Sequence, residues 1–288
     1  MSIAKLFAQK NVVFSFEIFP PKRDSSIHTI WSTLEELRDL RPDFISVTYG
    51  AGGSGGRSVT AQIAGAIRQR YGIPPLAHLT CVNSTRQEVE ESLRQLREEG
   101  VEDILALRGD LVPGVAPKTD FTYASDLVDF IRRQGGFSLS GACYPEGHTQ
   151  APDLDTDIQN LRRKVEAGAE HLISQLFFDN SAFYRFAEKA RAAGISVPIE
   201  AGIMPVVNAK QITRMVSLCG ASLPQKFVRM ISRYEGNPAA LRDAGIAYAV
   251  DQIVDLIAQG VEGIHLYTMN DPAVARRISG AVENLRKA

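Results

Sequence analysis

VVFSFEIF, residues 12–19, is the first of eight short apolar runs that decide the fold of this chain. Each run is rich in β-branched or aromatic residues, and a stretch with helical periodicity follows it. The other runs are FISVTY (44–49), LAHLTC (76–81), DILALRG (103–109), LSGACY (139–144), HLISQLFF (171–178), PIEAGIMP (198–205) and GIHLYTM (263–269). They recur about every 32 residues in a chain of 288, which predicts an α/β protein with a (β/α)₈ barrel.

Polar residues stand at the ends of these apolar runs. They are Glu17, Thr48, Tyr49, His78, Thr80, Arg108, Asp110, Tyr144, Glu146, Gln175 and Tyr267. In barrels of this kind the active site lies at the carboxyl ends of the strands. A barrel built only for packing would not need so many polar groups there, so we expect them to surround a functional site.

The bulk composition is that of an ordinary globular protein. Hydrophobic residues make up 44% of the chain and charged residues 23%, which is enough apolar material for a substantial core. Because the repeat is unbroken, we expect one domain spanning residues 1–288. The formal net charge of −1 gives no excess of positive charge for binding nucleic acid or an anionic membrane.

The sequence also predicts a cytoplasmic protein. No apolar run approaches the roughly 18 residues that span a bilayer, and the N-terminal MSIAKLFAQKN lacks the apolar segment of a signal peptide. Cys81, Cys143 and Cys219 form no CxxC pair and are odd in number, which argues against a disulfide framework or a zinc ribbon. We therefore expect a reducing compartment and no bound metal.

The intervals between the runs carry helix start and stop signals. Asn237-Pro238 is typical of an N-cap followed by proline in the first helical turn. The helix that follows should end at Gly260. Its buried face should consist of Val250, Ile253, Val254 and Ile257. Because the interval between the seventh and eighth runs is longer than one helix requires, we predict an extra helix over residues 224–234.

Glu17 stands inside the first apolar run, ahead of Pro20 and Pro21, which end the strand. An ionised carboxylate in a barrel interior is costly unless it is paired. One interpretation is a structural bridge to an arginine or lysine on a neighbouring strand. The other is a general acid that lies against a bound ligand and donates a proton to it. Both stay open, and the gathering of polar strand ends favours the second.

Two strand-end loops suggest ligand contacts without proving them. VTYGAGGSGGR has five glycines in the seven residues from Gly50, which would let the backbone approach a ligand closely. It lacks the spacing of a dinucleotide fingerprint or a P-loop, and a flexible loop explains it equally well. LRGD places Arg108 where it could hold a phosphate and Asp110 at the barrel mouth. A mutual ion pair between these two residues is the alternative.

The second half of the barrel adds three further features. YPEGH offers Tyr144, a carboxylate and His148, and a ligand contact or an ordinary surface histidine would both explain it. The next helix carries Asp157, Asn160, Arg163 and Lys164 at helical spacing. Such a pattern is usually a solvated face. Gln175 is an amide in a strongly apolar run, and a heterocycle with donor and acceptor edges would satisfy it.

Taken in order, these motifs resemble the methylenetetrahydrofolate reductase family. They are SFEIFPPK, VTYGAGGS, HLTC, ALRGD, YPEGH, KVEAGAE, SQLFFD, GIMPV and HLYTMN. No single motif is decisive, but the ordered set extends from Phe14 to Asn270 and is highly specific. The length resembles that of the bacterial form, which lacks the C-terminal regulatory domain of the animal enzymes.

The resemblance implies a flavin-containing barrel that reduces 5,10-methylenetetrahydrofolate to 5-methyltetrahydrofolate with NADH or NADPH. It implies a ping-pong scheme, in which folate replaces the nicotinamide over the same face of FAD. The residues that match flavin-binding positions are Thr48, Tyr49, Ala51, His78, Arg108, Gly109, Asp110, Tyr123, Ala124, Tyr144, His148, Asp157, Asn160, Arg163 and Lys164. The basic helix face would then lie near the FAD phosphates.

Catalytic and substrate positions follow from the same resemblance. Glu17 matches the catalytic acid, which would protonate the imidazolidine ring of the substrate so that it opens to an iminium. Asp110 matches a position shared between flavin and folate, where its charge would disfavour anionic reduced flavin and favour the cationic iminium. Gln175 and Gln211 match folate-contacting positions, where they would hold the pterin.

Three departures from the family pattern are visible. The glycine-rich loop continues as Gly55-Gly56-Arg57-Ser58 rather than with polar and basic residues. After HLYTMN the chain has Asp271, where some members have a folate-contacting arginine, and Met215 stands where some have an aromatic residue. These changes leave the implied flavin site intact and put the contacts to the folate glutamate tail in doubt.

Two alternatives to a self-sufficient flavoenzyme stay open. The barrel could pass hydride directly from nicotinamide to folate without a flavin, which the set His78, Arg108, Tyr144 and Lys164 argues against. The chain could instead be a subunit that receives electrons from a partner protein, because a partner surface leaves no motif. We expect a small-molecule substrate and a homo-oligomer, with neither nucleic acid nor membrane as a partner.

Overall fold

The structure, a computed structural model, describes residues 2–21, 28–49, 54–111, 114, 116, 118–208, 212 and 219–288, without the side chains of residues 28 and 54–57. Eight parallel strands pair in sequence order and close into a barrel, so the predicted (β/α)₈ fold is confirmed. The strands are β1 (Val13–Ile18), β2 (Ile45–Val47), β3 (Pro75–Thr80), β4 (Asp103–Leu107), β5 (Ser138–Cys143), β6 (His171–Ser174), β7 (Ile199–Ile203) and β8 (Gly263–Tyr267).

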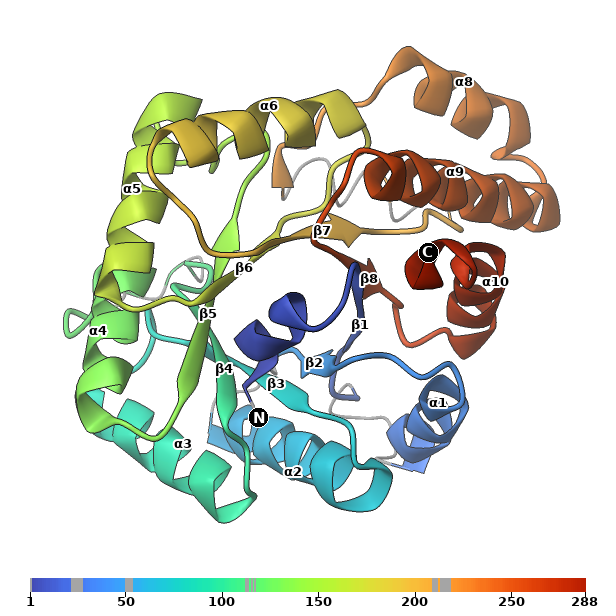
Figure 1. Cartoon of the computed structure of the whole chain (residues 1–288). Helices are drawn as coiled ribbons and strands as arrows, with labels where there is room; N and C mark the ends of the chain where they lie inside the picture. The colour runs from blue at the N-terminus through green and yellow to red at the C-terminus, as the bar shows by residue number, and fades with distance from the viewer. Residues whose placement is uncertain are drawn as a thin grey trace.

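Helices surround this ring of strands (Figure 1). They are α1 (His28–Arg38), α2 (Ser54–Tyr71), α3 (Arg86–Glu98), α4 (Ala124–Gln134), α5 (Leu154–Ala167), α6 (Asn180–Ala192), α8 (Gln225–Tyr234), α9 (Pro238–Ala258) and α10 (Pro272–Val282), with the short 3₁₀ helices η1 (Ile3–Ala8) and η2 (Leu285–Lys287). The extra helix predicted between β7 and β8 is α8. Over the ranges described, no helix is both long enough and apolar enough to cross a membrane.

Alternation along each strand separates the helix-facing side from the barrel interior. On β1, Phe14 and Phe16 belong to the large apolar core that also contains residues of the surrounding helices. Ser15 and Glu17 alternate with them and lie inside the barrel. The register between β1 and β8 pairs Ser15 with His265 and Glu17 with Tyr267. Barrel closure therefore joins polar residues from opposite ends of the chain.

β6 is shorter than its apolar run, because the chain leaves the sheet at Gln175. There the side-chain Oε1 of Gln175 accepts a hydrogen bond from the Leu176 backbone N–H, at 2.9 Å. That bond takes the place of a ladder partner for Leu176. The remaining apolar residues of the run pack as loop and core rather than as strand.

α9 begins as predicted, with the Asn237 side chain accepting a hydrogen bond from the Ala240 N–H at 3.2 Å and with proline in the first turn. Its predicted buried face is partly wrong. Ile253 is fully buried, but Val254 is 41% exposed. The buried side also holds small and polar residues, Gly245, Ala249 and Gln252 among them, which an apolar count misses.

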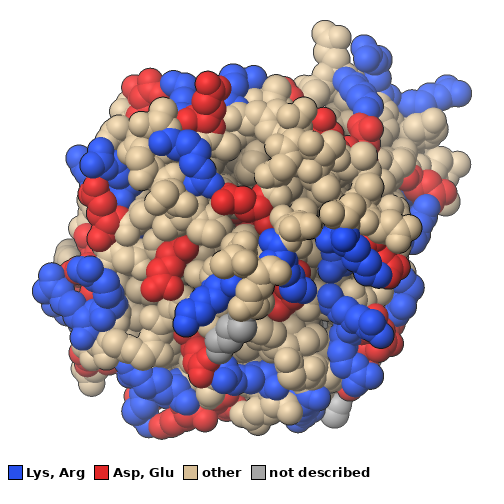
Figure 2. Space-filling model, in the orientation of Figure 1, with Lys and Arg blue, Asp and Glu red and all other residues tan. Residues whose placement is uncertain are grey.

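η1 closes the amino-terminal end of the barrel, and Figure 1 shows it at the centre of the ring of strands. Ile3 is fully buried in a small apolar cluster that includes Val13 and Leu76, which lie near the starts of β1 and β3. The Ile3 N–H donates to Asp103 Oδ1 at 2.8 Å. On the face in view, basic and acidic side chains are interspersed (Figure 2). Because η1 packs against the strands there, the amino-terminal end of the barrel is filled, and the cavities lie at the opposite end.

Candidate active site

A cavity of about 640 Å³ opens at the carboxyl ends of the strands. Its lining includes ten of the residues assigned from sequence, namely Glu17, Thr48, Tyr49, His78, Arg108, Gly109, Asp110, Tyr144, His148 and Gln175. They come from six strands or strand ends and lie together as predicted. We call this space the mouth cavity.

A second cavity of about 530 Å³ adjoins the first between α4 and α5. It adds Tyr123, Ala124, Asp157, Asn160, Arg163 and Lys164 from the sequence assignments. Arg108, Tyr144 and His148 line both spaces, so the two form one continuous groove. We call the second space the outer cavity. Ala51 and Gln211 lie outside the described residues, as does Met215.

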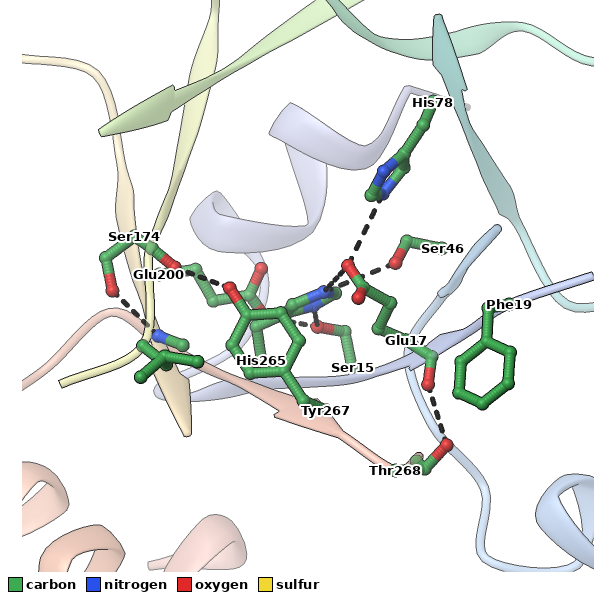
Figure 3. Close-up of polar contacts among 12 residues, drawn as sticks. Ser15, Glu17, Phe19, Ser46, His78, Ser174, Glu200, His265, Tyr267 and Thr268 are labelled. Carbon is green, nitrogen blue, oxygen red and sulfur yellow. Dashed lines mark hydrogen bonds and ion pairs between the residues drawn. The ribbon is translucent and has the colours of Figure 1, made fainter. Parts of the chain in front are cut away.

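The Glu17 carboxyl lies at the floor of the mouth cavity, between two histidines (Figure 3). Its Oε2 is 3.5 Å from His78 Nε2 and 3.6 Å from His265 Nε2. Within the described ranges, the basic side chains within 4.0 Å of its carboxyl oxygens are these histidines, so the alternative of a bridge to arginine or lysine is not what the structure has. Burial lowers the pKa of His78 to about 4, against the opposing pull of Glu17, so the imidazole is neutral at neutral pH.

The LRGD turn places its residues without an ion pair between them. Arg108 donates hydrogen bonds to the Gln150 side chain and to the Gly109 carbonyl, rather than to Asp110. Gly109 has φ +87°, and a Cβ there would lie 3.0 Å from Thr80 Cβ. Glycine therefore lets the turn pass close to β3. The exposed Asp110 stays at the rim of the mouth cavity.

Lys164 is a partly buried cation on the wall of the outer cavity. Its stem crosses β5 at Gly141, where a Cβ would lie 2.7 Å from Lys164 Cδ. Its Nζ donates to the Ala142 carbonyl at 2.5 Å. Burial lowers the pKa of Lys164, and nearby Cys143 and Asp157 oppose that shift. An ammonium group keeps three donors, so most of its hydrogen-bonding capacity faces the cavity.

The remaining groove wall combines a carboxyl group with aromatic rings. Asp157 Oδ2 accepts a hydrogen bond from the His148 N–H at 3.1 Å, and burial raises the pKa of Asp157. The rings of Tyr144 and His148 meet edge to face with centroids 4.7 Å apart. Burial raises the pKa of Tyr144 to about 12, so its hydroxyl keeps its proton and can donate to a ligand.

Gln175 and Tyr267 line the mouth cavity on the side of β6 and β8. The Gln175 oxygen is used by the Leu176 N–H, and its NH₂ group is left to face the cavity. The Tyr267 hydroxyl donates to the Ser174 carbonyl at 2.8 Å. Tyr267 lies near the end of the eighth apolar run, and the sequence predicted no binding or catalytic role for it.

Sequence reasoning missed a polar cluster beneath Glu17, which we call the interior cluster. It consists of Ser15, Ser46, His171, Glu200 and His265, all fully buried. The signal was present, since Ser15 precedes Glu17 by two residues and His265 precedes Tyr267 by two, which places each pair on one strand face. No group of three or more His, Cys, Asp or Glu side chains that could hold a metal occurs in the part of the chain described.

The departure at Asp271 has a structural explanation. Asp271 is the N-cap of α10, and its Oδ1 accepts from the Val274 N–H at 3.1 Å. It also forms an ion pair with Arg242, at 2.8 Å. Asp271 therefore stabilises a helix start. The Gly55–Arg57 departure falls on side chains that are not described.

Comparisons with known proteins agree with this geometry. The family model for "Methylenetetrahydrofolate reductase" matches residues 2–283. The 5,10-methylenetetrahydrofolate reductases of Pectobacterium carotovorum and Escherichia coli (strain K12) are each 38% identical over 269 residues, which covers 93% of this chain and 89% of theirs. Methylenetetrahydrofolate reductase (NADH) 1 of Arabidopsis thaliana is 33% identical over 93% of this chain and 48% of the plant protein.

Solved structures of similar fold include one that binds a folate. It is an uncharacterized protein from Clostridium thermocellum that binds two copies of 5-methyl-5,6,7,8-tetrahydrofolic acid. Its TM-score is 0.67 with 14% sequence identity, and the match covers 98% of each chain. At that identity the likeness shows the fold alone.

Proposed function

The chain belongs to the methylenetetrahydrofolate reductase family and is an oxidoreductase, and we propose that it reduces 5,10-methylenetetrahydrofolate with NADH or NADPH through non-covalently bound FAD. The observation that carries this proposal is the continuous groove, which has a carboxyl group at one end and a partly buried cation in its side branch. The cation suits the phosphate-bearing tail of a redox cofactor, and the carboxyl group suits an acid beside its ring.

The side chains of the groove fit FAD. Lys164 and Arg163 both line the outer cavity, and cations with several N–H donors suit a pyrophosphate. The Gly109 backbone lines the mouth cavity, and His78 and Tyr144 supply polar groups for a ring bound there. We infer that the ring lies in the mouth cavity and the phosphates lie beside Lys164 and Arg163.

When bound, FAD supplies the hydride transfer between nicotinamide and folate, which is the chemistry of the cofactor itself. Because both substrates would use the same mouth cavity of about 640 Å³, we expect them to bind in turn, as a ping-pong scheme requires. Glu17 protonates the substrate nitrogen that leaves when the imidazolidine ring opens. Its position between two histidines, on the cavity floor, suits an acid that a bound ring covers from above.

Gln175 and Asp110 would bind the folate from opposite sides of the mouth cavity. The free NH₂ group of Gln175 is a donor for a pterin acceptor, and Asp110 is an acceptor at the rim. We place Gln211 in the same role from the family resemblance. The Clostridium thermocellum protein of similar fold binds a methylated tetrahydrofolate, which supports a folate in this kind of barrel by analogy.

Purification and stopped-flow spectroscopy test the proposal. We expect a yellow protein whose flavin spectrum bleaches with NADH under anaerobic conditions and recovers with 5,10-methylenetetrahydrofolate. A colourless folded protein that oxidises NADH with folate would identify direct hydride transfer instead. A yellow protein that NADH cannot bleach, but a chemical reductant can, would identify a subunit that needs an electron-delivering partner.

A further inference from the structure

A line of polar side chains runs from Glu17 down to a second carboxyl group inside the barrel (Figure 3). Glu17 Oε2 lies 3.6 Å from His265 Nε2, and His265 Nδ1 lies 2.6 Å from Ser15 Oγ. Ser15 Oγ in turn lies 2.6 Å from Glu200 Oε1. Only the first contact is longer than a hydrogen bond, and a shift of roughly 0.5 Å in the Glu17 carboxyl would close it.

The protons in this line are coupled, because a hydroxyl has one hydrogen and a neutral imidazole has one N–H. If Glu200 is ionised, Ser15 donates to it and accepts from Nδ1–H of His265. The Nε2 lone pair then faces Glu17 and also Ser46, whose Oγ lies 3.2 Å away, and it favours a protonated Glu17. If Glu200 is protonated, both hydrogen bonds reverse, and Nε2–H faces Glu17 and favours its carboxylate. A protonated Glu200 is therefore compatible with an ionised Glu17, and the line can carry a proton from Glu200 to Glu17.

The surroundings of Glu200 keep this proton away from water. Glu200 and Ser15 are fully buried. The other Glu200 oxygen lies 3.3 Å from His171 Nε2 on β6, and burial lowers the pKa of His171 to about 3, so that ring is neutral. Burial also raises the pKa of Glu200 to about 7; His265 and Ser15 oppose this, and Asp43 adds to it. Glu200 can thus hold a proton near neutral pH.

We propose that Glu200 is a positioning residue that stores a proton and returns it to Glu17 through Ser15 and His265. The proposal rests on the function proposed above, in which Glu17 loses a proton to the folate nitrogen. A bound ring would cover Glu17 from the side of the mouth cavity, so its proton cannot come back directly from water. The line below Glu17 supplies a route that the ligand does not block.

The step transfers one proton within the protein and changes no oxidation state. The O–H bond of Glu200 breaks as its proton passes to Ser15 Oγ, and the Ser15 proton passes to His265 Nδ1. The Nε2 proton of His265 passes to the Glu17 carboxylate. The products are a Glu200 carboxylate, the other neutral tautomer of His265 and a protonated Glu17, so the total charge is unchanged. Solvent refills Glu200 by the reverse path after the product leaves.

Two variants break the line and one matched variant does not. Ser15→Ala removes the connecting hydroxyl, and Glu200→Gln removes the exchangeable proton while keeping the side-chain shape. Ser140→Ala is the control. It is also a buried serine inside the barrel, but it contacts His171, at 3.0 Å, on the far side of Glu200.

Single-turnover kinetics of the holoenzyme provide the first measurement. In Ser15→Ala and Glu200→Gln, reoxidation of the flavin by 5,10-methylenetetrahydrofolate should slow about tenfold, less than the 10²–10⁴-fold that an acid itself is worth. Its pH profile should change, and reduction by NADH should stay within about twofold of the original rate, because that step needs no acid. Ser140→Ala should match the original protein in both half-reactions.

Infrared difference spectroscopy of the protein during a pH titration provides a readout that does not depend on turnover. A protonated-carboxyl band that titrates near neutral pH should be present in the original protein and in Ser140→Ala, and absent in Glu200→Gln. Its persistence in Glu200→Gln would overturn the proposal. So would unchanged folate kinetics in both line-breaking variants, equal slowing of both half-reactions, or equal slowing by Ser140→Ala. Failure of both half-reactions in the original protein would instead overturn the proposed function, and with it this role in turnover.

Discussion

Two groups of buried polar side chains lie in one barrel, and they are satisfied in different ways. The outer-cavity wall holds Lys164, which spends one of its three N–H donors on the Ala142 carbonyl. The interior cluster is bonded mostly within itself, and Ser15 Oγ contacts both Glu200 and His265 at 2.6 Å. Burying a polar group is costly unless it gains a partner. We expect a ligand to be the missing partner in the first group, whereas the protein itself supplies most of the partners in the second.

This difference separates what a substitution should change. Removing a polar group from the cavity wall should weaken ligand binding more than folding, because such a group makes few contacts with the rest of the chain, as Lys164 does with the Ala142 carbonyl. Removing one from the interior cluster should alter stability or proton transfer, because its neighbours depend on it. Glu17 lies where the two groups meet, and substitution there should have the largest effect.

Glu17→Gln should reduce the folate half-reaction by about 10²–10⁴-fold, because Gln keeps the shape but cannot donate the proton that ring opening requires. Flavin reduction by NADH should be spared, since hydride transfer from nicotinamide needs no acid. Stopped-flow measurement of each half-reaction checks this. Equal slowing of both half-reactions would indicate that Glu17 has a structural role. If neither half-reaction slows, another residue is the acid, and Asp110 and Glu146 are the next candidates.

Lys164→Met should raise the dissociation constant for FAD by roughly 10- to 100-fold, the loss expected for one charge-assisted hydrogen bond. The apoprotein should not unfold more easily, because burial disfavours the Lys164 charge. Arg162→Met is the matched control, because Arg162 lies on the same helix but pairs with Glu166 on an exposed face. Fluorescence titration of apoprotein with FAD measures both variants, and equal weakening in the two would remove Lys164 from the phosphate site.

The sequence predicted the fold and most of the groove because those signals are local. Strands follow from short apolar runs, and α9 follows from the Asn237-Pro238 start. The groove residues stand at strand ends, and a barrel brings all strand ends together without any need to know which side chains touch. The family resemblance extended this to the α5 face, where charge spacing alone favoured a solvated helix.

The interior cluster could not be assembled in the same way. Ser15 is 185 residues from Glu200 and 250 from His265, and their contact depends on barrel closure and on the β1–β8 register. A serine in a strand and a lone glutamate carry little information until that register is known. The prediction that Val254 is buried was wrong for a related reason, because hydrophobicity does not say which face of α9 meets the barrel.

Glu200→Gln should also change how stability depends on pH. The pKa of Glu200 is about 7 in the folded protein against 4.5 for the ordinary side chain, so the unfolded chain ionises first as pH rises. The original protein should therefore lose stability between about pH 4.5 and 7, and Glu200→Gln should gain on it by roughly 3 kcal/mol over that window. Urea unfolding followed by the fluorescence of the single tryptophan, Trp31, measures this.

Glu170→Gln is the control for that titration. It changes a carboxyl group that is exposed and hydrogen-bonded to Ser138, so its stability curve should run parallel to that of the original protein. A constant difference between Glu200→Gln and the original protein at every pH would contradict a buried proton at Glu200. A difference that grows as pH falls would contradict the sign of the burial effect.

Asp110→Asn should have the smallest effect, because Asp110 is exposed at the rim and water screens its charge. A negative charge beside the ring disfavours the anionic reduced flavin, so its removal should raise the flavin reduction potential by roughly 20 mV. FAD should stay bound, and the folate half-reaction should slow more than the nicotinamide one, because folate loses both reducing power and a contact. Dye equilibration measures the potential, with Asp120→Asn as an exposed carboxylate outside both cavities. An unchanged potential would leave Asp110 as a folate contact alone, and an equal rise in Asp120→Asn would trace the effect to overall charge rather than to the rim.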